Sequence, residues 1–114
     1  MPFINSKVTV KISPEKEERI KQRLGQAITI IPGKSESFLM VGFDDEYSLY
    51  FKGNKCEKAA FVDVKLYGKA TSDACNQMTG EICRIYEEEL GIPKVNIYVT
   101  YQSIADWGWN GANF

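Results

Sequence analysis

The order strand, helix, strand occurs twice along this chain of 114 residues, and this repetition constrains the fold more than any other feature. Residues 4–12 alternate between apolar and polar side chains, which predicts a strand with one buried face. A helix is expected to begin at Ser13-Pro14, because serine caps helices and proline is tolerated at their first position. Pro32-Gly33 ends that helix, and a second strand is expected over residues 37–43.

The second half of the chain follows the same plan with little sequence in common. Residues 59–67 form the next expected strand, and a helix is expected to begin at Ser72-Asp73. Apolar residues at helical spacing, Cys75 among them, are expected to form its buried stripe. Gly91 ends this helix, because glycine is favoured just after a helix, and residues 95–101 form the last expected strand.

Together the two units predict an α+β fold, a duplicated β-α-β arrangement in which a four-stranded mixed sheet carries both helices on one face. Short extra strands are expected over residues 48–51 and within the tail, residues 106–114, which holds both tryptophans beside glycine. The length of the chain fits a single domain over residues 1–114.

The other face of this sheet is left without a cover. Within residues 59–67, Phe61 points to one side and Val62 and Val64 point to the other, so both sides are partly apolar. Exposed apolar faces of this size usually mark association surfaces. We therefore expect several copies of the chain to pack their sheets around a common centre in a closed cyclic assembly.

The composition excludes several classes of partner. The 14 basic and 15 acidic residues nearly balance, which argues against nucleic acid, because phosphate binding needs a basic surface. No apolar run reaches the roughly 18–20 residues of a membrane span, and no signal peptide is recognisable. Cys56, Cys75 and Cys83 are odd in number and lack CxxC spacing, so we expect no disulfide framework and a reducing, cytoplasmic location.

The chain contains no histidine, which removes Ser-His-Asp and Cys-His nucleophile systems and most zinc sites. A base that works at neutral pH must then be another group. Pro2 directly follows Met1, and removal of Met1 leaves a secondary amine at the start of the chain. An exposed α-amino group has a pKa near ~7.7–8.0, and burial in an apolar pocket lowers that pKa, which suits proton transfer.

Several motifs besides Pro2 are spread over the whole chain. They are Gly33-Lys34, Phe51-x-Gly53, Tyr67-Gly68-Lys69, Leu90-Gly91-Ile92-Pro93, Ile97-Tyr98-Val99 and Gly108-Trp109-Asn110-Gly111-x-x-Phe114. In this order and spacing they resemble the macrophage migration inhibitory factor family, within the tautomerase superfamily, from Met1 to Phe114.

This resemblance implies a homotrimer with three sites, each at a subunit boundary. In the family, the processed N-terminal proline is the catalytic base for keto–enol substrates such as phenylpyruvate and dopachrome methyl ester. Pro2 matches that proline, and Lys34 matches a lysine that faces the substrate carboxylate. Neutral Pro2 would take a carbon-bound proton while Lys34 stabilises the enolate, so neither a metal nor an organic cofactor is needed.

Five further positions match the family's substrate pocket. Tyr67 lies where the family binds a carboxylate through a backbone N–H, and because it replaces a smaller aliphatic residue it is expected to narrow the pocket. Tyr98 matches a tyrosine contributed by the neighbouring subunit, and Trp109 and Phe114 match aromatic residues at the pocket rim. Thr100 stands where an asparagine contacts the far end of the substrate, which leaves only a shorter hydroxyl there.

Some activities of the family are not expected here, and two alternatives stay open. Residues 59–62 lack the CxxC linked to a thiol-oxidoreductase activity in the family. The chain could instead be a cytokine-like binding protein with a vestigial pocket, acting on a host protein receptor after export without a signal peptide. Decarboxylation or dehalogenation of short acids is less favoured, because it generally uses pocket arginines, whereas Arg19, Arg23 and Arg84 fall in expected helices.

Overall fold

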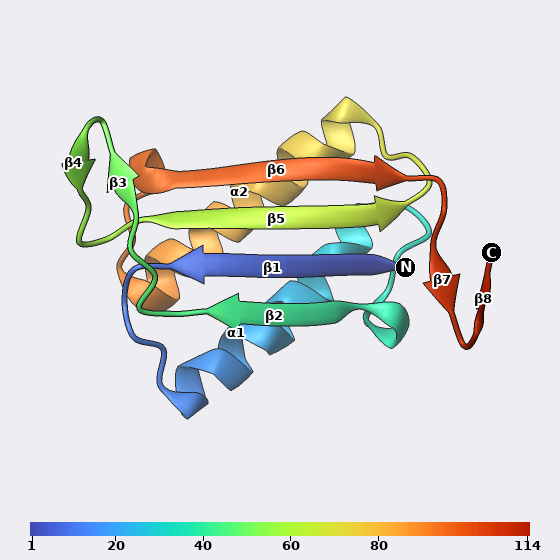
Figure 1. The fold of residues 1–114 in the computed structure, drawn as a ribbon, viewed down its shortest axis with the longest axis horizontal. Coiled ribbons are helices and arrows are strands. Elements are labelled where there is room, and N and C mark those ends of the chain that lie inside the picture. The colour runs from blue at the N-terminus through green and yellow to red at the C-terminus, as the bar shows by residue number, and fades with distance from the viewer.

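A computed structural model describes residues 1–114 and contains one four-stranded sheet in the order β2-β1-β5-β6. Both helices cover one face of this sheet, as Figure 1 shows. The long elements are β1 (Pro2–Val8), α1 (Pro14–Ala27), β2 (Met40–Asp44), β5 (Ala60–Tyr67), α2 (Ser72–Leu90) and β6 (Ile97–Ile104). The pairs β1–β2 and β5–β6 are parallel, and β1–β5 is antiparallel, so the predicted mixed α+β sheet is confirmed.

Short elements connect these units and lie at the two ends of the sheet. Three 3-10 turns are η1 (Ile28–Ile30), η2 (Glu36–Phe38) and η3 (Lys94–Asn96). Four two-residue strands form two hairpins, β3 (Tyr50–Phe51) with β4 (Asn54–Lys55), and β7 (Gly108–Trp109) with β8 (Ala112–Asn113). The hairpins project from opposite ends of the sheet in Figure 1.

The first β-α-β unit differs from the sequence expectation at its strand ends. The strand expected over residues 4–12 begins at Pro2 and ends at Val8. Beyond it the chain turns away, and the Ile12 amide donates to Asp45 Oδ2 at 2.9 Å instead of to a strand. Ile12 is still buried, which explains why its apolar character continued the alternation. The strand expected over residues 37–43 begins only at Met40, because η2 precedes it.

Helix α2 follows its sequence signals at both ends. The Thr71 hydroxyl accepts a hydrogen bond from the Ala74 amide at 3.1 Å and caps the start of the helix. Gly91 ends it in the left-handed conformation, with φ of 68°. The buried stripe contains Ala74, four residues before Met78, whereas Cys75 is only half-buried, so its expected place in the stripe was wrong.

The core lies between the sheet and the two helices. It is almost entirely aliphatic, and its largest fully buried members include Ile4, Ile20, Leu24, Leu66, Met78, Ile82 and Ile85. One polar pair crosses it, because the Tyr86 hydroxyl donates a hydrogen bond to Ser6 Oγ. Ser6 is the single buried polar side chain, so this contact satisfies a group whose burial would otherwise be costly. Neither helix is long and apolar enough to cross a membrane.

No helix covers the second face of the sheet (Figure 1). Phe61 and Tyr98 make one apolar end, and Phe3 and Met40 make the other. The middle is polar, since Thr100 Oγ1 donates to Asp63 Oδ1 at 3.0 Å. The expected partly apolar, uncovered face is therefore present, and it is divided into apolar ends with a polar centre.

Candidate active site

The residues matched to a catalytic centre gather where β1 begins and β5 ends. Pro2 is the first residue of β1 and lies opposite Leu66 of β5. Its ring is buried on the same side as Ile4, as its position in the alternation predicts. Met1 precedes it and is half-buried. The β7–β8 hairpin flanks this end of the sheet in Figure 1.

A tight turn after the first helix places Lys34. Pro32 and Gly33 occupy its central positions, Gly33 has φ of 80°, and the Lys34 amide donates to the Ile31 carbonyl at 3.1 Å. Proline followed by glycine in this conformation is typical of a type II turn. The Lys34 side chain is half-buried, and its Nζ donates to the Tyr67 carbonyl oxygen at 2.8 Å. Two residues matched independently to the site are thus in direct contact.

Met1 lies beside both Tyr67 and Lys34. The Tyr67 amide donates to the Met1 carbonyl oxygen at 3.0 Å. The pKa of the Met1 α-amino group lies below its ordinary value, because burial disfavours its charged form and, to a smaller extent, the Lys34 ammonium repels it. An amine at this end of β1 is therefore in an environment that favours its neutral form.

The tail folds into a hairpin that supplies the aromatic wall. Asn110 and Gly111 have φ of 55° and 87°, which is typical of the two-residue type I′ turn. The Trp109 and Phe114 rings stack with centroids 6.1 Å apart and planes 6° apart. Phe114 also contacts Tyr67, with ring centroids 5.3 Å apart, so the hairpin is joined to the end of β5.

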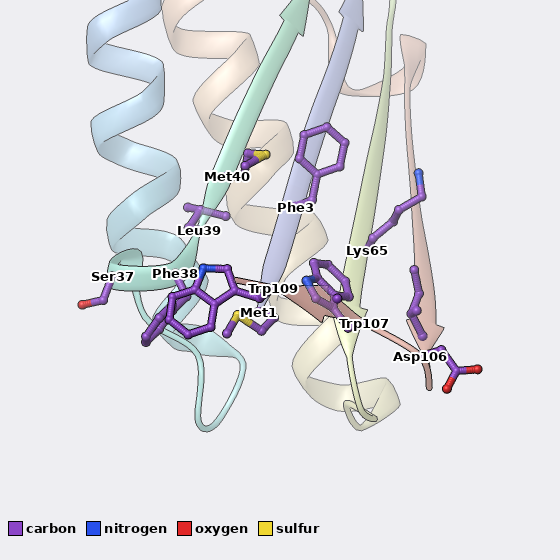
Figure 2. A pocket seen from close by; sticks show the side chains of 12 residues that line it. Met1, Phe3, Ser37, Phe38, Leu39, Met40, Lys65, Asp106, Trp107 and Trp109 are labelled. Carbon is purple, nitrogen blue, oxygen red and sulfur yellow. The ribbon is translucent and has the colours of Figure 1, made fainter. Parts of the chain in front are cut away.

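A pocket of about 660 Å³ lies beside this cluster, toward the uncovered sheet face, as Figure 2 shows. Its lining includes Met1 and Trp109 but not Lys34, Tyr67 or Phe114, so it adjoins the matched residues rather than enclosing them. The remaining lining residues are Phe3, Ser37, Phe38, Leu39, Met40, Lys65, Ile104, Asp106, Trp107 and Gly108.

Sequence reasoning had assigned none of these remaining residues to a site. Phe38 packs edge-on against Trp109, with ring centroids 5.8 Å apart, and Phe3 lies on the opposite side of β1 from Pro2. The alternation in β1 placed Phe3 on the uncovered face, but its partners there depend on the pairing of β1 with β2 and β5. The sequence therefore held a signal for Phe3 and none for Phe38.

Tyr98 and Thr100 do not join this cluster within one chain. Tyr98 lies opposite Phe61, whereas Tyr67 lies opposite Ile104, six residues further along β6. At about 3.3 Å per residue this separates Tyr98 from the Tyr67 end by roughly 20 Å. Tyr98 packs edge-on against Phe51 and Phe61, at centroid distances of 5.4 and 6.4 Å.

The three arginines are away from the cluster, as expected. Arg19 and Arg23 bind Glu88 and Glu89 across the two helices, and Arg84 pairs with Glu81. What gathers at the end of β1 is therefore one ammonium group, one backbone N–H and aromatic walls. This set suits an anion attached to an apolar or aromatic group.

Comparisons with known proteins agree with this arrangement. The family model described as macrophage migration inhibitory factor (MIF) matches residues 1–114. The crystal structure of Leishmania major MIF2 is 34% identical with a TM-score of 0.93, and the match covers 100% of this chain and 97% of that chain. A search of curated protein sequences found no match.

Two more distant structures share the fold. The macrophage migration inhibitory factor of Toxoplasma gondii has a TM-score of 0.90 and 24% identity, over 98% of this chain and 99% of that chain. A macrophage migration inhibitory factor-like protein from Entamoeba histolytica has a TM-score of 0.87 and 21% identity, over 99% of this chain and 98% of that chain. From the full-length family match and the similarity to Leishmania major MIF2, this chain belongs to the macrophage migration inhibitory factor family.

Proposed function

We propose that this protein, after removal of Met1, is a keto–enol tautomerase of phenylpyruvate-like α-keto acids, with Pro2 as the acid–base group. Dopachrome-type compounds are a second substrate class. The family membership supports an isomerase of the tautomerase superfamily, and the residues at the end of β1 support the finer assignment of substrate and mechanism.

The contact that carries this proposal is the hydrogen bond from the Tyr67 amide to the Met1 carbonyl oxygen, 3.0 Å long. A carbonyl oxygen is held there, next to Lys34 and directly before the Pro2 nitrogen. Removal of Met1 frees the Tyr67 N–H and converts the Pro2 nitrogen from an amide into an amine. A substrate carboxylate oxygen could then replace the Met1 carbonyl within reach of the base.

The reaction follows from these roles. The neutral Pro2 amine accepts the proton on the carbon next to the keto group, and the electrons of that C–H bond form the enolate. Lys34 and the Tyr67 N–H stabilise the added negative charge, and protonated Pro2 returns its proton to the enolate oxygen. The reverse direction uses the same groups. Positioned acid–base catalysis of this kind contributes about 10²–10⁴-fold.

A homotrimer is part of the proposal. Tyr98 lies roughly 20 Å and Thr100 roughly 13 Å from the Tyr67 end of their own chain, so they can reach a pocket only in another copy. The uncovered sheet face with its apolar ends supports packing of copies around a common axis. Light scattering during gel filtration tests the stoichiometry, and a monomer at working concentration would contradict it.

The deciding experiment combines intact mass with a rate measurement. Mass spectrometry identifies the fraction of chains without Met1, and the absorbance of enol-phenylpyruvate follows its conversion to the keto form. We expect processed wild-type protein to be active and Pro2→Gly to lose about 10²-fold or more. Lys11→Met is the matched surface control, since Lys11 is exposed and lies outside the pocket. Equal rates for wild type and Pro2→Gly would refute the proposed base.

A second candidate function is binding of a protein partner through the rim. Trp109 and Phe114 are each 54% exposed and Phe38 is 52% exposed, which is unusual for large rings unless a ligand or a partner covers them. This candidate is favoured if the processed trimer is inactive toward α-keto acids. It predicts that Trp109→Ala abolishes partner binding without changing the oligomeric state.

A further inference from the structure

The pocket of about 660 Å³ contains one cation that the proposed reaction does not use. Eight of its twelve lining residues are hydrophobic, and Lys65 is the single basic residue among them. Lys65 is half-buried on the uncovered face of β5, directly opposite Phe3 of β1. The pocket is therefore an apolar space with an ammonium group on its wall.

Lys65 has no charged partner in the structure. It belongs to none of the six ion pairs and donates no side-chain hydrogen bond. Its closest favourable contact is the face of Phe3, with Nζ 5.8 Å from the ring centroid. Asp106 also lines the pocket, but its carboxylate points away from the aromatic rings in Figure 2. The Lys65 charge is thus free to meet an anion.

The position of Lys65 relative to Tyr67 sets the size of such a ligand. The two residues share one face of β5 and are two positions apart, about 7 Å along the strand. The Tyr67 end holds the Met1 carbonyl and Lys34. A ligand that spans both positions therefore needs an acidic group at each end of a body about as long as a substituted benzene ring.

We propose that Lys65 makes the pocket a second anion-binding position, so that the preferred substrate is an aromatic α-keto acid with a further acidic group on its ring. This inference rests on the proposed function. The α-keto acid end lies at Tyr67 and Lys34, the ring lies between Phe3 and the tryptophans, and the second acidic group pairs with Lys65.

The kinetic test compares the enols of 4-carboxyphenylpyruvate and phenylpyruvate with processed, full-length protein. The readout is the ratio of the two kcat/KM values. We expect wild type to favour the dicarboxylate about tenfold, as one partly exposed, charged hydrogen bond would do. Lys65→Met should remove this preference and Lys65→Arg should restore it. Lys7→Met is the matched control, since Lys7 lies on the same sheet face but outside the pocket.

A binding test separates this inference from the proposed function. Both tryptophans line the pocket, so their fluorescence reports a ligand without any turnover. Homoterephthalate should bind wild type about tenfold more tightly than phenylacetate, and Lys65→Met should bind the two equally. If phenylpyruvate is not converted but this difference is present, the proposed reaction fails and the second anion position stands.

Two results would overturn the inference. One is a wild-type protein without preference for the doubly acidic ligand in both tests. The other is an equal loss of affinity for both ligands in Lys65→Met. Such a loss, particularly with a changed oligomeric state in light scattering, would assign Lys65 to the contact between copies.

Discussion

Lys34 Nζ donates a hydrogen bond to the carbonyl oxygen of Tyr67 at 2.8 Å, and the N–H of the same Tyr67 holds the Met1 carbonyl at 3.0 Å. The backbone of Tyr67 thus has two roles: its carbonyl oxygen orients the Lys34 ammonium, and its N–H can donate to an anion. The turn after α1 and the end of β5 are joined at this point, so the geometry depends on both β-α-β units.

The pH dependence of the reaction should move when Lys34 is replaced. Burial first and the Lys34 ammonium second lower the pKa of the Met1 amine, and removal of Met1 leaves the Pro2 amine at the same end of β1. Because the neutral Pro2 amine is the proposed base, the rate should rise with pH through the pKa of that amine. In Lys34→Ala the pKa of the Pro2 amine should rise, so the rising limb of the pH–rate profile moves to higher pH. Profiles of kcat/KM measure this, and an unchanged limb would remove Lys34 from the surroundings of Pro2.

Retention of Met1 should block chemical labelling as well as turnover. The electrophile 2-oxo-3-pentynoate is an α-keto acid whose conjugated alkyne adds to neutral amines. We expect one covalent adduct on Pro2 in processed chains and none at Pro2 in chains that keep Met1, where that nitrogen is an amide. Peptide mapping by mass spectrometry locates the adduct. Preferential labelling of a lysine in processed protein would contradict the assignment.

The tail hairpin should depend on its turn. Gly111 has φ of 87°, which costs a residue with a side chain about 1 kcal/mol or more, so Gly111→Val weakens the hairpin that carries Trp109. We expect KM to rise several-fold while the thermal midpoint falls by only a few degrees. Asn110→Gly is the control, because glycine adopts the same conformation. A large loss of stability without a change in KM would mean that the hairpin supports the fold and not the pocket.

The buried pair of Tyr86 and Ser6 should be visible as a stability difference. Tyr86→Phe leaves the Ser6 hydroxyl buried without its donor, so we expect a loss of about 1–2 kcal/mol in the free energy of unfolding. Adding Ser6→Ala should recover part of this loss, since both polar groups are then absent. Urea unfolding of the single and double variants measures the coupling, and strictly additive losses would argue against it.

Acid should weaken the contact between the two helices through Glu89. Its pKa is lowered chiefly by the hydrogen bond from Arg19, while burial opposes this and Arg23 adds to it. A carboxyl with a lowered pKa stabilises the fold above its ordinary pKa, and this stabilisation is lost as pH falls from that value through the lowered pKa of the folded state. Glu89→Gln should therefore cost up to about 1 kcal/mol at pH 7 and less at pH 3. Thermal midpoints at both pH values test the difference.

The sequence predicted the elements whose signals are local. The Ser13-Pro14 start of α1 and the Gly91 end of α2 are set by capping and backbone freedom, and both occur where expected. The end of β1 was misplaced because Ile12 is buried outside the sheet, and alternation alone cannot distinguish that burial from a strand.

The part of the candidate site that one chain contains was the part that the sequence could predict. Pro2, Lys34 and Tyr67 match motifs and lie together at one end of the sheet. Lys65 carries no motif, and its importance depends on facing Phe3 across two strands. That relationship follows from the register of β1 and β5, which the residues of neither strand specify by themselves.

The placement of Pro2 and Tyr98 at opposite ends of one sheet has a genetic consequence for the proposed ring of three copies. A chain defective at Pro2 would still lend its tyrosine to a neighbour, and a chain defective at Tyr98 would still supply its amine. Two inactive alleles expressed together would then regain some working centres in mixed rings. A chain defective at both positions would instead damage two centres at once and act dominantly over the wild-type allele.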